Sequence, residues 1–143
     1  MKKITIALLF FVFYFEVLHA RYLNRSDFPF IIKEYDRKII VNKDGTREIT
    51  TKIRLKIKKE AGRKRLAIYP IVYNNALSKI TIVNAAVING KKKQKVAKTN
   101  IVDKPMAKKN YGFDSANIIK IALPNLKVGS IVEIEYKEDA KET

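Results

Sequence analysis

The chain has 143 residues, carries 30 Lys and Arg against 14 Asp and Glu, and contains no cysteine. Its formal net charge of +16 favours anionic partners. The absence of cysteine excludes disulfides, a thiolate nucleophile and a lipid-modified cysteine anchor.

Residues 1–20 have the layout of a secretory signal peptide. Two lysines give a positive start, residues 4–15 are apolar apart from Thr5, and Ala20 closes a short polar stretch. We expect cleavage after Ala20 and a secreted or periplasmic location. The alternative is an uncleaved leader, which is the only route by which we expect contact with a membrane. A helix over residues 4–15 would reach about 18 Å, which is short of a hydrocarbon core of about 30 Å.

Cleavage would leave residues 21–143 with 28 basic and 13 acidic side chains and a net charge of +15. It would also remove His19, the single histidine of the chain. Cys-His and Ser-His-Asp catalytic sites and the usual thiolate or imidazole zinc sites are therefore excluded from the mature chain. We expect no enzyme activity, no cofactor and no metal. We also expect a lead-in at residues 21–29 and one domain at residues 30–143.

The first part of this domain has the pattern of a β-hairpin. Residues 46–58 alternate between apolar and polar side chains, which predicts a half-buried strand. Residues 31–42 are rich in Ile, Val and Tyr, and Gly45 in the connection can adopt a positive φ at low cost. A short strand is predicted next at residues 65–73, at an edge or a bend because it contains Pro70.

A second hairpin is predicted further along the chain. Residues 79–88 are apolar and β-branched, which indicates a strand covered on both faces. Asn89 and Gly90 suit a type I′ turn, and residues 91–98 would form the returning strand.

The remaining sequence predicts one irregular stretch and two closing strands. Residues 100–112 lack a strand pattern, whereas residues 118–123 and 131–137 have one. Residues 138–143 are typical of a solvated tail or of the start of a linker. About seven strands and no helix result. We therefore predict an all-β fold, an antiparallel β-sandwich.

Several segments follow one another in an order that resembles one family of domains. The segments are NKDGT at residues 42–46, IYP at 68–70, NAAVINGK at 84–91, DKPMAKKNYG at 103–112 and LPNLKVGSIVEIEY at 123–136. Their order resembles the domain of unknown function that stands N-terminal to transglutaminase-like domains in secreted and periplasmic bacterial proteins. The resemblance implies a β-sandwich without catalytic residues of its own. It covers the N-terminal part of the family domain, which normally continues past the closing strand.

Basic side chains at two places are candidate contacts for a polyanion. They lie on the arm of the second hairpin and in the irregular stretch, where a tyrosine accompanies them: Lys91, Lys92, Lys93 and Lys95, then Lys108, Lys109 and Tyr111. The structural alternatives are that the lysines discourage edge-to-edge aggregation and that the tyrosine closes the end of the sandwich.

Two aspartates flank the same irregular stretch. Asp103 and Asp114 are interpreted as turn residues, with a shared Ca²⁺ as the alternative, because carboxylates are ligands that Ca²⁺ prefers. Neither residue belongs to a recognisable calcium-loop spacing.

These observations predict a non-catalytic accessory or interaction domain that is secreted or periplasmic. Its partner would be a protein or an anionic envelope polymer, and sheet-edge pairing is one mode of contact. Nucleic acid is not the favoured partner, because the lysines are spread along the chain. Two alternatives remain. The chain could be the N-terminal part of a transglutaminase-like enzyme whose catalytic domain is absent from it, or a basic module of the cell envelope that binds polyanions.

Overall fold

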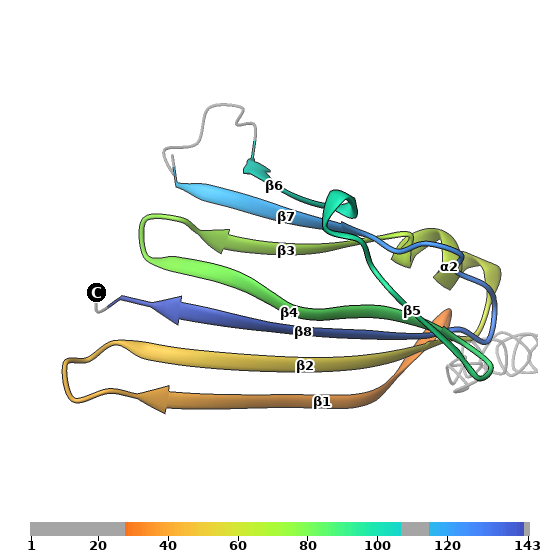
Figure 1. Cartoon of the computed structure of the whole chain (residues 1–143), viewed down its shortest axis with the longest axis horizontal. Coiled ribbons are helices and arrows are strands. Elements are labelled where there is room, and N and C mark those ends of the chain that lie inside the picture. The colour runs from red at the N-terminus through yellow and green to blue at the C-terminus, as the bar shows by residue number, and fades with distance from the viewer. Residues whose placement is uncertain (1–27, 107–114, 142–143) are drawn as a thin grey trace, which may run out of the picture.

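The computed structural model describes residues 28–106 and 115–141 (Figure 1). Several predictions lie outside the described residues. They concern the leader, most of the lead-in, and Lys108, Lys109, Tyr111 and Asp114. Within them the strands are β1 (Phe30–Val41), β2 (Arg47–Ile57), β3 (Ile68–Asn74), β4 (Ser78–Asn89), β5 (Lys92–Lys95), β6 (Ile101–Pro105), β7 (Ala116–Ala122) and β8 (Ile131–Ala140). Two short helices accompany them, α2 (Glu60–Leu66) and the 3₁₀ helix η2 (Lys98–Asn100).

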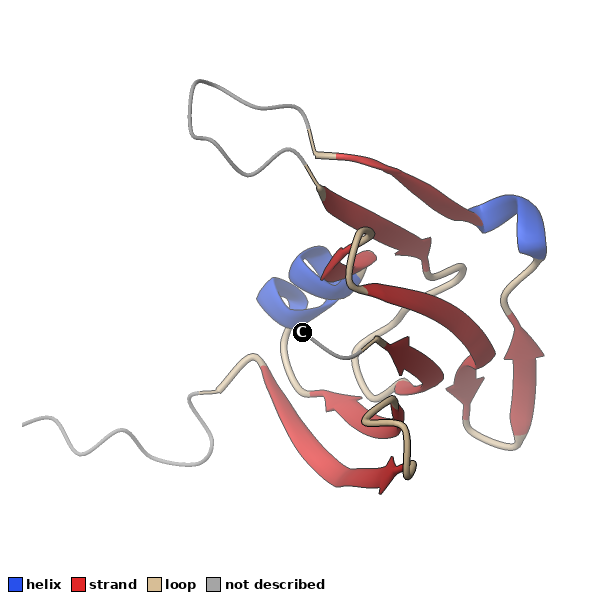
Figure 2. Cartoon of the chain, turned by 90° about the vertical axis from the view of Figure 1, so that its left-hand side faces the viewer, coloured by secondary structure: helices blue, strands red, loops and turns tan. Residues whose placement is uncertain are grey.

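The strands form two antiparallel sheets. The larger sheet has the order β1-β2-β8-β4-β5 and the smaller sheet the order β3-β7-β6. Figures 1 and 2 show the smaller sheet lying over part of the larger one, with α2 at one end of the space between them. The predicted all-β sandwich is confirmed, with eight strands in the described part of the chain.

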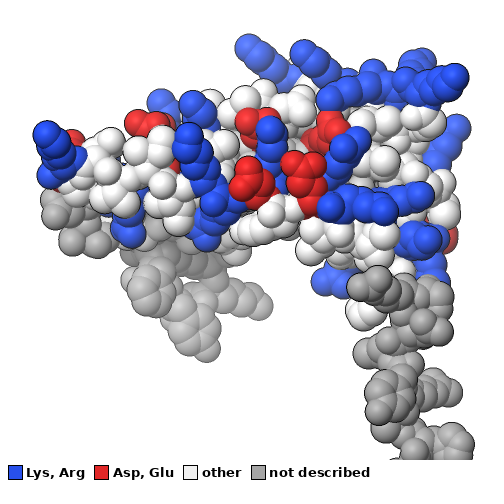
Figure 3. Space-filling view, turned by 90° about the horizontal axis from the view of Figure 1, so that it is seen from below, with Lys and Arg blue, Asp and Glu red and all other residues white. Residues whose placement is uncertain are grey.

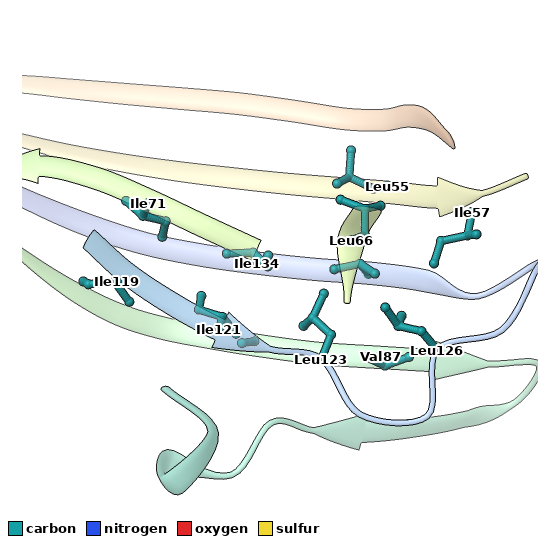
Figure 4. Packing of buried hydrophobic residues seen from close by; sticks show 12 residues of the cluster. Leu55, Ile57, Leu66, Ile71, Val87, Ile119, Ile121, Leu123, Leu126 and Ile134 are labelled. Atoms are coloured by element: carbon teal, nitrogen blue, oxygen red, sulfur yellow. The ribbon is translucent and has the colours of Figure 1, made fainter. Parts of the chain in front are cut away.

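The hydrophobic core lies between the two sheets (Figure 4). Alternation places one apolar face of each central strand inward, and α2 and the segment after β7 close one end. The buried side chains of this cluster are Leu55, Ile57, Leu66, Ile71, Ala85, Val87, Ile119, Ile121, Leu123, Leu126, Val132 and Ile134. The alternation predicted for β2 and β8 is therefore confirmed.

The sequence did not predict helix α2. Seven residues are too few to display helical periodicity, Gly62 is a poor helix former, and the N-cap residue Lys59 makes no side-chain capping bond. The strand predicted from residue 65 therefore begins later, at Ile68. Its edge position is confirmed, because Pro70 pairs with Lys120 of β7 while β3 ends the smaller sheet.

Two segments predicted to lack strand structure belong to the sheets. Residues 101–105, inside the predicted irregular stretch, form β6, whose brevity and terminal Pro105 concealed its pattern. The prediction of a solvated tail was wrong for residues 138–140, which belong to β8. Glu138, for example, pairs with both Ile49 and Ile80. A strand that is central in the sheet keeps its backbone pairing even where its side chains are charged.

The second hairpin differs from its prediction in two details. Asn89 pairs with Lys92, so the turn residues are Gly90 and Lys91, and only Gly90 has a positive φ, at 60°. A type I′ turn requires two positive φ angles, so that prediction was wrong. β4 is also exposed at Val83, where a register shift interrupts its pairing with β8.

Candidate interaction surfaces

The predicted basic contact on the second hairpin does not form one patch. In the β4-β5 pairing, Lys93 and Lys95 lie opposite Ile88 and Ala86 on the outer face of the larger sheet, and Lys92 lies on the other face. Lys93 Nζ is also 2.5 Å from Glu133 Oε2, so its charge already has a carboxylate partner.

The outer face of the larger sheet carries rows of alternating charge. Arg54 Nε lies 3.3 Å from Glu133 Oε1, and Lys52 Nζ lies 4.0 Å from Glu135 Oε2. On the β1 side, Glu34 pairs in register with Arg54, and Asp36 pairs with Lys52. These rows line a hollow of about 300 Å³. Because neighbouring strands supply opposite charges, this face is neutralised by its own side chains, and it is a poor candidate for polyanion binding.

A polar cluster lies on the inward side of the smaller sheet. Tyr73 Oη donates to Asp103 Oδ2 at 2.6 Å, and Asn117 Nδ2 donates to Asp103 Oδ1 at 3.1 Å. The hydrogen bond to the carboxylate raises the pKa of Tyr73, because it stabilises the protonated phenol. Asp103 thus links three strands. The Ca²⁺ alternative for Asp103 also required Asp114, which lies outside the described residues.

The segment that carries most of the family resemblance has a structural role. Ser130 Oγ, which is buried, donates to Asn89 Oδ1 at 2.5 Å and accepts from the Lys127 N–H at 2.8 Å. Asn125, whose φ is 54°, donates to Gln94 Oε1 at 3.0 Å. These bonds hold the segment between β7 and β8 against the second hairpin. Packing therefore explains the specific amino-acid sequence of this segment, which does not indicate a ligand site.

The inward face of β1 is apolar except at Arg37, and it is uncovered. Ile32, Tyr35 and Ile39 pair with the core-facing residues Leu55, Ile53 and Ile49 of β2, so they point toward the side of the smaller sheet. The exposed fractions of this set, which we call the β1 strip, nevertheless remain high: Ile32 62%, Tyr35 58%, Ile39 53% and Val41 66%. The smaller sheet does not extend over them. The sequence predicted the strand but not this exposure.

A group of tyrosines marks the border between the β1 strip and the core. Burial raises the pKa of Tyr69 on β3, and the nearby Tyr136 and Tyr35 raise it further. Tyr69 is half-buried, whereas the Tyr35 side chain is exposed.

The described part of the chain shows neither a metal site nor a membrane-spanning helix. Residues 28–106 and 115–141 contain no group of three or more His, Cys, Asp or Glu side chains arranged to hold a metal ion. Across the same residues, no helix has both the length and the apolar character needed to cross a bilayer.

Comparison with known proteins identifies a family and a fold. A model of DUF3857, described as a domain of unknown function with a solved structure, matches residues 43–143. The crystal structure of a protein from Parabacteroides distasonis ATCC 8503, provisionally named a protease, is similar with a TM-score of 0.72 and 13% identity. That match covers 80% of this chain but only 24% of the other chain. No curated protein matches.

A second solved structure has weaker similarity. It is the CBM3a-L domain with flanking linkers from the scaffoldin CipA of the Clostridium thermocellum cellulosome. Its TM-score is 0.45 at 12% identity, with coverage of 79% of this chain and 68% of that one.

Proposed function

The chain belongs to the DUF3857 family of domains of unknown function, and from this premise we propose that it is a non-catalytic accessory domain that docks a protein partner through strand β1. We place it outside the cytosol, in the periplasm or secreted, on the basis of the leader pattern in residues 1–20.

The observation that carries this proposal is the exposed β1 strip. Ile32, Tyr35, Ile39 and Val41 form an apolar row on the face where the other strands bury their side chains, and Arg37 is the one charged residue within this row. Apolar surface of this kind favours contact with another protein, because burial removes it from water. An isolated exposed Ile would carry no such meaning, but four apolar side chains among the five inward positions from residue 32 to residue 41 do.

The backbone of β1 supplies the second part of a docking site. β1 has twelve residues and ends the larger sheet, with β2 on one side. The opposite side therefore offers a long row of N–H and C=O groups to an added strand. Peptide partners commonly use such an edge, with main-chain bonds for affinity and alternate side chains for specificity. A partner strand would bond to this edge and cover the β1 strip.

An enzyme domain is the first partner to consider. The fold of this chain makes up 24% of a longer chain that is provisionally named a protease. The order of motifs from NKDGT to LPNLKVGSIVEIEY also resembles domains that precede transglutaminase-like domains. We propose that β1 contacts an enzyme domain of this kind, on the same polypeptide or on a separate one.

Site-specific photo-crosslinking in the native cells tests this function. A photoreactive amino acid would replace Ile39 in the β1 strip and, as the matched control, Val72, which is 59% exposed on β3. The proposal predicts one discrete adduct from position 39 that mass spectrometry assigns to a protein, and none of that mass from position 72. Equal adducts from both positions, or none from position 39, would contradict it.

A further inference from the structure

One end of the molecule concentrates positive charge. We define the basic end as residues 28–30, 57–66, 89–93 and 123–130. These segments contain nine Lys and Arg but a single acidic residue, Glu60. Figure 3 shows basic side chains crowded at the same end that holds α2 and the β4-β5 hairpin in Figure 1.

Hydrogen bonds join these segments into one surface. The Pro29 carbonyl accepts hydrogen bonds from the Lys58 and Lys59 N–H groups at 2.9 and 3.1 Å, which ties the start of β1 to the approach of α2. The Gly129 N–H donates to the Ile57 carbonyl at 2.9 Å, and Asn89 Nδ2 donates to the Asn125 carbonyl at 3.0 Å. The nine cations are therefore brought together at one end of the molecule from three separate stretches of sequence, 57–66, 89–93 and 123–130.

The opposite end of the larger sheet is much closer to neutrality. We define the far end as residues 41–47, 74–79 and 137–141, which the pairings of Arg47 and Ser78 with Ala140 bring together. These segments contain five Lys and Arg against three Asp and Glu. The net charge of the chain is therefore distributed unevenly between the two ends.

The basic end also holds the first described residue and two exposed apolar side chains. Residue 28, the first described residue, lies at this end. Phe28 and Val128 are exposed large apolar side chains within it. Their neighbours Pro29 and Gly129 both bond to the Ile57–Lys58 segment, so the two apolar groups flank one point of the basic surface.

From this arrangement we infer that the basic end docks on a membrane surface that contains anionic lipid headgroups. Lysine and arginine clusters bind such surfaces electrostatically, and exposed apolar side chains can enter the interfacial region beneath the headgroups. Docking through this end orients the domain with α2 toward the bilayer. This inference is independent of docking at β1, which lies along the side of the sheet.

The internal charge pairs leave this surface strongly positive. Arg63 Nε donates to both carboxylate oxygens of Glu60, at 2.7 and 2.9 Å, and the pairing lowers the pKa of Glu60. Lys93 is paired with Glu133. The exposed lysines Lys58, Lys64 and Lys127 lie outside these pairs and are the clearest candidates for headgroup contact.

Vesicle sedimentation of the full chain tests the inference. Binding is compared between vesicles of phosphatidylcholine alone and vesicles that also contain phosphatidylglycerol, over a series of NaCl concentrations. Residues 1–27 are the same in the wild type and in every variant, so differences between these proteins report on the described domain. We expect additional binding to the phosphatidylglycerol vesicles that decreases as salt rises, because screening shortens the reach of the charges.

Two triple variants with equal loss of charge locate the contact. Lys58→Gln, Lys64→Gln and Lys127→Gln together should lower the phosphatidylglycerol-dependent binding constant by about tenfold or more, since each basic residue near an anionic surface adds affinity. The matched control, Lys43→Gln, Lys79→Gln and Lys141→Gln, removes three exposed lysines from the far end and should lower it by less than about threefold. Circular dichroism would confirm that both variants keep the fold.

Three results would overturn the inference. The first is equal binding to both kinds of vesicle. The second is an equal loss in the two triple variants, which would show that only the net charge matters. The third is retention on heparin or duplex DNA that depends on the basic end, without phosphatidylglycerol-dependent binding, which would assign the surface to a different polyanion. None of these results depends on whether β1 docks a protein, so failure here is distinguishable from failure of the proposed function.

Discussion

Gly62 of α2 packs directly against the Pro29 carbonyl group at the start of β1. A Cβ atom on residue 62 would lie 2.7 Å from the carbonyl carbon of Pro29 and closer still to its oxygen. That oxygen already accepts two backbone hydrogen bonds, from Lys58 and Lys59. The contact explains a glycine inside a helix, because the close approach of two backbones leaves no room for a side chain.

Gly62→Ala should therefore destabilise the domain, although alanine is the better helix former by about 1 kcal/mol. We expect a loss of about 1–3 kcal/mol in the free energy of unfolding, because Pro29 or α2 must shift to relieve the overlap. Urea denaturation would measure it. Ala61→Gly, at an exposed position of the same helix, serves as the control for propensity and should cost about 1 kcal/mol. Stabilisation by Gly62→Ala would show that α2 does not pack in this way.

Ser130→Ala should also destabilise the domain, by about 1–3 kcal/mol. The buried hydroxyl satisfies both Asn89 Oδ1 and the Lys127 N–H, and its removal leaves these groups without their partner. Thermal unfolding would detect the change. Ser78→Ala is the comparison, because that hydroxyl makes a longer bond of 3.3 Å at an exposed site and should contribute little. Equal effects at the two positions would contradict the role assigned to the Ser130 network.

The β1 strip and the core should respond differently to truncation. Ile134→Ala, at a side chain that is 1% exposed, should cost about 2–5 kcal/mol because it leaves a cavity. Ile39→Ala should cost less than about 1 kcal/mol, since most of that side chain is already in water. Chemical denaturation of the two variants provides the test. A cost at Ile39 that matches the cost at Ile134 would mean that the β1 strip is covered.

The hydrogen bond from Tyr73 to Asp103 should affect stability at alkaline pH. The raised pKa of Tyr73 means that the folded chain holds the phenol proton more tightly than the unfolded chain does. Tyrosines in the unfolded chain have a pKa of about 10. The resulting stabilisation is fully present below pH of about 10 and is lost as the pH rises through the folded-state pKa. Asp103→Asn removes the charged acceptor, so ultraviolet titration should show one tyrosine that ionises at lower pH. An unchanged titration curve would contradict this assignment.

The sequence predicted those parts of the fold in which local pattern and burial agree. β2 alternates cleanly because its inward residues, including Leu55 and Ile57, are buried and its outward residues face water. The closing strand β8 was predicted for the same reason. β6 and α2 were not predicted, because both are short and their place is set by contacts with distant segments, such as that between Gly62 and Pro29.

The two proposed interaction surfaces depend on tertiary arrangement, so sequence reasoning located neither. The row from Ile32 to Val41 is apolar except at Arg37, and its edge position, beyond the reach of the smaller sheet, leaves it exposed. The lysines of the second hairpin appeared to form a cluster, but strand alternation separates Lys92 from Lys93. The basic end contains Lys91, Lys92 and Lys93 of this hairpin together with the cations of residues 57–66 and Lys127, which are distant in sequence.

Residue-resolved amide hydrogen exchange on the isolated chain tests the central claim, that β1 offers a free edge for docking. Within Phe30–Val41, N–H groups that face β2 should be protected and those on the opposite side should exchange rapidly, so protection should alternate along the strand. Uniform protection across β1 would contradict the account, because it would mean that the outer edge already has a partner.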